Sequence, residues 1–200
     1  MYKRQPWRGT WAQDGGTLMN QCIHNIDLLQ WCLGGEPETV MAMTGNYLRD
    51  IEAEDFGAIL IRFKNGAIGI VEGTACVYPK NLEETLSVFG ATGTAVVGGL
   101  AVNRIQTWNF AEPAEQDETV AELSGTDPKN VYGSGHIALY EDYIRAVSTH
   151  TAPLVSGEEG IKGMKIILAA YKSQKTGQPV RFDNLSFSTL DMTSSDVKVK

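Results

Sequence analysis

The sequence predicts an α+β fold in which a predominantly antiparallel, open β-sheet has helices packed on one face. Three features predict it: an amphipathic helix near the start, short apolar or alternating segments in the middle, and two helical patterns near the end. Tight turns join most of the central segments, and strands joined in this way pair antiparallel. One face of such a sheet can be covered by helices while the other is used for association.

The first helix is expected from Gly15 to Trp31 and has two different faces. At about 100° per residue its apolar side chains share one arc, which is typical of a helix packed on a core. This arc consists of Leu18, Met19, Cys22, Ile23, Ile26, Leu29 and Leu33. The opposite arc has the three- and four-residue spacings that make helical side chains neighbours. Its members are Asn20, His24, Asp27 and Trp31, so it can present an amide, an imidazole and a carboxylate to one ligand.

Two candidate residues also have a structural interpretation. A histidine on a polar helical face is usually solvated, so the period alone favours an inert His24. Arg8 can stack on Trp7 or Trp11 as a surface guanidinium, or it can bind the carboxylate or phosphate of a substrate. The pattern alone leaves both residues open.

Strands are expected to follow the helix, which ends where Gly34-Gly35 precede Pro37. They are expected at residues 40–47, 56–63, 67–75, 85–89, 95–97 and 102–110, with a hairpin turn at Lys64-Asn65-Gly66. A surface connection over residues 112–130 then leads to the remaining elements. These are helices at residues 134–150 and 156–175 and a short strand at 178–182.

One globular domain is expected, because 200 residues with 42% hydrophobic content can bury a core. Residues 1–14 form an N-terminal segment whose start is expected to be truncated, and residues 15–183 form the domain itself. Residues 184–200 form a polar tail that is expected to fray.

Composition and charge argue against several kinds of partner. The formal net charge of -7 and the lack of a Lys/Arg cluster exclude a nucleic-acid surface. No apolar run approaches the roughly 20 residues that a membrane helix needs. The three cysteines, Cys22, Cys32 and Cys76, form no disulfide framework and, with three histidines and no Cys-x-x-Cys pair, give no metal-site spacing. A cytoplasmic protein without a metal, a membrane or a nucleic-acid partner is expected.

The residues of the polar arc carry a resemblance to a known family. The motif consists of Gly15-Gly16, Asn20, His24, Asp27 and Trp31, with Trp7-Arg8-Gly9-Thr10-Trp11 upstream. It resembles the start of the C-terminal domain of the Gfo/Idh/MocA oxidoreductases, which are nicotinamide-dependent sugar and polyol dehydrogenases. The active-site pattern of that family is Asp or Asn, three residues, then His.

The resemblance implies a role for each candidate residue. His24 would lie beside the substrate hydroxyl or carbonyl, as the base or as the partner of a lysine from the other domain, and Asn20 would orient the substrate. Many relatives have Asp in place of Asn20, which leaves the base open, and Asp27 could supply the orienting carboxylate. Arg8 would meet an anion, because its segment and the Asn-Gln before His24 resemble the branch that acts on nucleotide-linked amino-sugar uronates.

A second glycine-rich segment, Gly-Ser-Gly-His-Ile-Ala at residues 133–138, has the form of a dinucleotide fingerprint. Its context argues against a phosphate site, because no apolar strand leads into it and a second helix follows. In the family, a Gly-His pair before an aromatic helix is usual. The resemblance implies that His136 can lie near the substrate, whereas by itself His136 is interpreted as structural.

The resemblance covers residues 7–182 and matches only the second half of a family member. It implies a missing N-terminal Rossmann domain that binds most of the NAD or NADP and supplies the catalytic lysine. The chain is then expected to bind a sugar substrate, to form a homo-oligomer through its sheet face, and to be inactive alone. Two alternatives remain open: a stand-alone, non-catalytic association domain, and a cofactor-independent sugar epimerase or lyase that uses His24.

Overall fold

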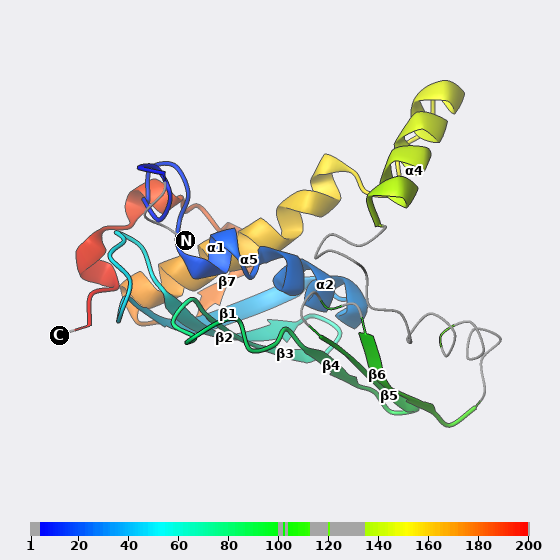
Figure 1. Cartoon of the computed structure of the whole chain (residues 1–200), viewed down its shortest axis with the longest axis horizontal. Helices are drawn as coiled ribbons and strands as arrows, with labels where there is room; N and C mark the ends of the chain where they lie inside the picture. Colours follow the sequence, from blue (N-terminus) through cyan, green and yellow to red (C-terminus); the bar gives the residue numbers. More distant parts are fainter. Residues whose placement is uncertain (1–4, 100–101, 103, 113–119, 121–134, 200) are drawn as a thin grey trace. The chain divides into compact units, whose positions relative to one another are not determined.

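The computed structural model describes residues 5–99, 102, 104–112, 120 and 135–199, which fall into two compact units. The first unit comprises Met1–Val77 and Gly157–Lys200, and the second comprises Tyr78–Ser156. Both units combine helix with strands (Figure 1), and the strands within each sheet pair antiparallel. The expected α+β class is therefore confirmed.

A four-stranded sheet lies at the centre of the first unit. Its order is β3-β2-β1-β7, and its strands are β1 (Pro37–Gly45), β2 (Phe56–Phe63), β3 (Ile68–Thr74) and β7 (Val180–Arg181). Figure 1 shows the helices α1 (Thr17–Asn20), α2 (Ile23–Leu33) and α5 (Gly157–Thr176) on one side of this sheet. Because alternate strand residues share a face, Val40, Ile59 and Ile61 are buried.

The opposite face of the same sheet carries a row of exposed apolar side chains. Met41, Leu60 and Ile70 are partners across β1, β2 and β3, and they are 41%, 50% and 77% exposed. Met43 and Ile68 are also exposed. The open face of an antiparallel sheet usually carries polar side chains, so this apolar row is suited to association with another surface.

The second unit contains a three-stranded sheet and a helix. Its strands, in the order β4-β5-β6, are β4 (Leu86–Phe89), β5 (Gly93–Gly98) and β6 (Arg104–Phe110). Helix α4 (Gly135–Thr149) carries mostly exposed side chains, while Ala146 is buried. The expected connection over residues 112–130 lies outside the described residues, apart from 112 and 120. Within the described parts of the chain, no helix combines the length and apolar character needed to cross a membrane.

The expected single helix over residues 15–31 is wrong, because the structure has two helices that meet at Gln21 and Cys22. The N–H groups of both residues donate to the carbonyl of Thr17, at 2.9 and 3.0 Å, and this closes α1. Tertiary contacts hold the two pieces separately, since α1 is bonded to Glu54 and α2 packs on α5. Helical periodicity does not reveal such a break, which contains neither Gly nor Pro.

The C-terminal segment is folded, although its polar sequence predicts a fraying tail. After η2 (Phe182–Asn184), the 3-10 turns η3 (Thr189–Asp191) and η4 (Ser194–Asp196) are each closed by a capping box. Met192 and Val197 are buried. Two apolar side chains at this spacing produce no helical or strand period, so the sequence pattern does not predict that the segment packs.

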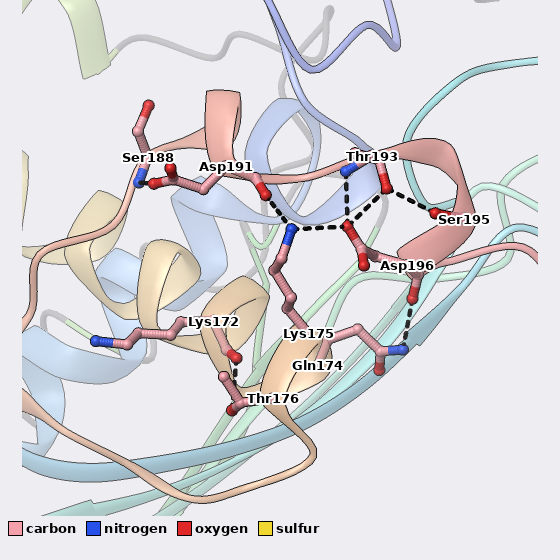
Figure 2. Close-up of polar contacts among 9 residues, drawn as sticks. All are labelled: Lys172, Gln174, Lys175, Thr176, Ser188, Asp191, Thr193, Ser195 and Asp196. Carbon is pink, nitrogen blue, oxygen red and sulfur yellow. Dashed lines mark hydrogen bonds and ion pairs between the residues drawn. The ribbon is translucent and has the colours of Figure 1, made fainter.

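Helix α5 holds this C-terminal segment through polar contacts. Figure 2 shows Lys175 donating to the carbonyl of Asp191 and forming an ion pair of 3.3 Å with Asp196. Gln174 Nε2 donates to the carbonyl of Asp196 at 2.9 Å. The segment also reaches the sheet, because Asn46, which follows β1, donates its N–H to the carbonyl of Val197 at 2.7 Å.

Side chains of α5 also complete the edge of β1. Strand β7 pairs with only the first part of β1, so N–H groups further along that edge need other acceptors. Ala42 N donates to Ser173 Oγ at 3.1 Å, and Thr44 N donates to Gln174 Oε1 at 2.8 Å. Ser173 is itself buried, so water does not replace its hydroxyl easily.

Replacing Ser173 by Ala is expected to lower the free energy of unfolding by about 1–2 kcal/mol, because the Ala42 N–H is left buried without its acceptor. Urea unfolding at neutral pH measures this loss. Thr176→Ala is the matched control, since its exposed hydroxyl donates to the carbonyl of Lys172 one turn back; we expect a change below about 0.5 kcal/mol. Equal losses in the two variants would contradict the role of Ser173 at the edge.

Candidate active site

Asn20 and His24 lie on either side of the turn between α1 and α2. Asn20 is the last residue of α1 and is half-buried, whereas His24 is in the first turn of α2 and is exposed. The break between the helices means that their four-residue spacing does not by itself make them neighbours. Their relative position depends on what anchors each helix.

Asp14 ties Asn20 to the N-terminal segment. Asn20 Nδ2 donates to Asp14 Oδ1 at 2.8 Å, and Asp14 Oδ2 accepts the N–H of Gly9 at 2.8 Å. This carboxylate therefore links the end of α1 to the turn that contains Arg8. Asp14 is not among the residues expected from the sequence, although an aspartate directly before two glycines is typical of a turn that binds backbone N–H groups.

Arg8 stacks on an aromatic ring of its own segment. Its Cζ lies 5.0 Å from the centre of the Trp7 ring, and its Nε donates to Gln5 Oε1 at 2.6 Å. Trp11 is buried instead, with its ring nearly perpendicular to that of Tyr171 at a centroid distance of 5.0 Å. Of the two stacking partners considered from the sequence, Trp7 is the one found, and the binding of an anion by Arg8 stays a prediction.

The polar arc expected on the first helix is divided between solvent and a helix contact. A Cβ atom placed on Gly163 of α5 would lie 3.2 Å from the Cβ of Asp27, so Asp27 lies where α2 packs closely on α5. His24 and Trp31 are exposed, Trp31 to 71%. An orienting role for Asp27 stays a prediction.

His136, the second residue of α4, belongs to the second unit and is exposed. Its approach to a substrate also stays a prediction.

Glu54 lies beneath α1 and is fully buried. Its Oε1 accepts the N–H of Leu18 at 2.9 Å and the hydroxyl of Tyr171, from α5, at 3.0 Å. Its carbonyl accepts the N–H of Thr17 at 2.9 Å. Glu54 therefore accepts two of the N–H groups at the start of α1 that have no acceptor within the helix. The N–H of Gly16 donates to the Tyr171 hydroxyl at 3.3 Å, which joins the turn to the same network.

Each glycine of the pair before α1 is required by the local structure. Gly15 has φ +103°, which favours glycine over residues with a side chain. A Cβ atom on Gly16 would lie 2.0 Å from Glu54 Oε2 and 2.3 Å from the Glu54 carbonyl oxygen. The backbone at Gly16 therefore closes directly over the carboxyl group. A glycine pair that precedes a helix is the sequence signal that could have pointed to a buried partner, but it does not say which residue that partner is.

Burial raises the pKa of Glu54 from 4.5 to about 7. The Leu18 N–H, the nearby backbone N–H of Glu54 itself and the Tyr171 hydroxyl lower this pKa, and the charge of Asp55 raises it. Burial, together with Glu54, also raises the pKa of Tyr171 well above its usual range. Glu54 is thus a buried carboxyl that exchanges its proton near neutral pH.

The neighbouring residue, Asp55, is also buried, but its surroundings stabilise the charged form of its carboxyl group. Its Oδ1 accepts the N–H of Tyr47 at 2.9 Å, and its Oδ2 accepts those of Leu48 and Arg49 at 2.7 Å each. Burial raises the pKa of Asp55, but these N–H donors outweigh burial and hold the pKa below the usual 3.8. Asp55 therefore fixes the turn after β1 as a charged group, while Glu54 beside it favours the neutral form.

Glu54→Gln is expected to flatten the pH dependence of stability. The folded-state pKa of about 7 exceeds the usual 4.5, so the folded chain binds more protons and the contribution of Glu54 is fully present below pH 4.5. It is lost as the pH rises through 7, which lowers the free energy of unfolding by on the order of 3 kcal/mol in the wild type. Glutamine keeps an oxygen for Leu18 and Tyr171 without this titration.

Urea unfolding at about pH 5 and at about pH 8 measures the difference. Glu72→Gln, at an exposed position of β3, is the matched control and should keep the full wild-type decrease. A Glu54→Gln variant that loses as much stability as the wild type over this interval would show that Glu54 does not carry the effect.

The described residues contain no glycine-rich phosphate turn between a parallel strand and a helix. A glycine-rich phosphate turn joins a parallel strand to a helix, whereas pairing within both described sheets is antiparallel. Residues 133–134 of the second glycine-rich segment lie outside the described residues. In the described ranges there is also no group of three or more His, Cys, Asp or Glu side chains that could hold a metal ion.

Comparison with known proteins gives the family of the chain. The family model of the oxidoreductase C-terminal alpha/beta domain, GFO_IDH_MocA_C, matches residues 2–182. Myo-inositol 2-dehydrogenase of Thermotoga maritima is 26% identical over 185 residues, which cover 86% of this chain and 50% of the relative.

Two solved structures are more similar in sequence. The WlbA dehydrogenase of Bordetella pertussis, in complex with NADH and UDP-GlcNAcA, is 39% identical with a TM-score of 0.84, over 92% of this chain and 53% of that one. The WlbA dehydrogenase of Chromobacterium violaceum, with the same two ligands, is 38% identical with a TM-score of 0.81, over 93% and 51%. The chain thus spans about half the length of these relatives, and it belongs to the Gfo/Idh/MocA oxidoreductase family through its C-terminal domain.

Proposed function

We propose that the chain is the substrate-binding and oligomerisation part of an NAD(P)-dependent dehydrogenase that acts on a sugar, polyol or nucleotide-sugar hydroxyl. The observation that carries this proposal is the 39% identity to a dehydrogenase whose structure holds NADH and UDP-GlcNAcA. We further propose a UDP-linked amino-sugar uronate as the substrate. Its carboxylate suits a guanidinium, which binds carboxylates through paired N–H donors, and Arg8 is the candidate.

Within this proposal, His24 exchanges the proton of the reacting hydroxyl. Imidazole is the side chain best suited to proton transfer at neutral pH, and His24 is exposed at the start of α2, where a substrate can reach it. Asn20 orients the substrate through hydrogen bonds, and its contact with Asp14 fixes its amide. Asp27 and His136 are further candidates for contact with the substrate.

In this reaction the nicotinamide cofactor, NAD or NADP, accepts the hydride. We propose that a dinucleotide-binding N-terminal half holds most of this cofactor. The relatives are about twice as long as this chain, and the described residues do not form a phosphate turn. We therefore propose that the 200-residue chain is inactive alone and needs that half for turnover.

The exposed sheet face supports the second part of the proposal, association between copies of the chain. The row Met41, Leu60 and Ile70 is apolar across three neighbouring strands and exposed. Burying such a row against a second copy removes apolar surface from water, which is the main driving force for stable oligomers. This observation also fits a stand-alone association domain, so turnover must separate the two functions.

Replacing His24 by Ala tests the catalytic proposal. In the complete enzyme, with this chain joined to its dinucleotide-binding half, we expect kcat for NAD(P)-linked oxidation of the substrate to fall by about 10²–10⁴-fold, the usual contribution of a general acid or base. Substrate binding should change much less. His150→Asn, at the residue directly after α4, is the control and should keep full activity. Unchanged turnover in the His24 variant would leave the association domain as the function.

Replacing Leu60 by Glu tests the association. A charge in the middle of the apolar row would be buried unpaired in an oligomer, so we expect association to weaken by at least about 100-fold. Sedimentation velocity at micromolar concentration measures this change. Leu190→Glu, at an exposed position of η3, should sediment as the wild type does. A wild-type chain that is already a monomer would exclude association through this face.

A further inference from the structure

The buried carboxyl group of Glu54 has one oxygen in use and one without a partner. Its Oε1 accepts two hydrogen bonds, from Leu18 N and from the Tyr171 hydroxyl, whereas Oε2 has no hydrogen-bond partner among the described residues. The backbone of Gly16 closes over Oε2, as the position of its missing Cβ shows. A buried carboxylate oxygen without a partner destabilises the ionised form of the group, so this environment favours the neutral acid.

The hydrogen bonds of Glu54 lead directly to the candidate active site. Glu54 binds the N–H groups of Thr17 and Leu18, the first two residues of α1. The carbonyl of Thr17 in turn accepts the N–H groups of Gln21 and Cys22, in the turn that leads into His24. Asn20 is the last residue of this four-residue helix. The carboxyl group of Glu54 is therefore connected through Leu18 to α1, and through α1 to the turn that leads to α2.

Among the described residues, no cation shifts the pKa of this carboxyl group. The ionisable groups that shift it are Asp55, next to it in the chain, and Tyr171 of α5, and neither is a cation. Helix α1 contacts it through backbone N–H groups, and none of the residues of α1 is ionisable. The neutral carboxylic acid fits this environment. An ionised carboxylate needs compensation at Oε2, which requires either an entering water molecule or a movement of the Gly16 backbone and α1.

We propose that Glu54 is a positioning residue for the candidate active site: a change in its charge moves α1 and, with it, Asn20 and the turn that leads to His24. This inference rests on the proposed function, because it takes Asn20 and His24 as the residues that meet the substrate. It assigns to Glu54 no contact with the substrate. The raised pKa of Glu54 places the change near neutral pH.

Proton–nitrogen correlation spectra of the full 200-residue chain, recorded without substrate or cofactor between about pH 5 and about pH 9, test the inference. The Leu18 amide reports on Glu54 directly, because it donates to Oε1, and the backbone and side-chain amides of Asn20 report on the site. We expect both residues to show the same inflection near pH 7. Glu54→Gln should abolish it in both, and Glu72→Gln should leave it unchanged.

A His24→Gln background separates this inflection from the titration of the imidazole, and the inflection should persist there. Two results would overturn the inference. In one, the Leu18 inflection survives in Glu54→Gln; in the other, Leu18 titrates while Asn20 does not, so that Glu54 acts on the fold without moving the site. The spectra involve no turnover, so they are independent of the loss of activity in His24→Ala that tests the proposed function.

Discussion

The burial of Glu54 beneath α1 is the constraint on which the site depends. One carboxyl group joins two parts of the chain that are far apart in sequence, the start of α1 and Tyr171 of α5, and the Tyr171 hydroxyl also accepts the N–H of Gly16. The backbone at Gly16 has no room for a side chain over this group. Gly16 and the start of α1 follow from this contact, and with them the position of Asn20 at the end of α1.

At the edge of the four-stranded sheet, too, side chains accept backbone N–H groups from a distant part of the chain. Strand β7 is too short to pair with all of β1, so Ser173 and Gln174 of α5 accept the N–H groups that remain. Lys175, the next residue, binds the C-terminal segment, which in turn reaches Asn46 after β1. One helix thus provides the core face, the edge and the anchor for the last residues of the chain.

We propose a different function for each face of the four-stranded sheet. The helix-covered face carries the residues that we propose for proton exchange and substrate orientation, and the open face carries an apolar row suited to a second copy of the chain. We propose that a separate half holds the dinucleotide, since pairing within the described sheets of this chain is antiparallel. Such a division lets hydride chemistry and substrate choice be built on separate folding units.

The sequence by itself determined the class of fold, the strands and late helices and the polar residues near His24, because these depend on local periods, turns and a short motif. Tertiary structure decided where the first helix breaks, how Asp14 and Glu54 hold its two parts, and that the polar C-terminal segment folds. The bonds that decide them, such as Glu54 to Leu18 and Lys175 to Asp191, join residues distant in the chain. A side chain that is buried by residues distant in the chain does not produce a helical or strand periodicity in the sequence.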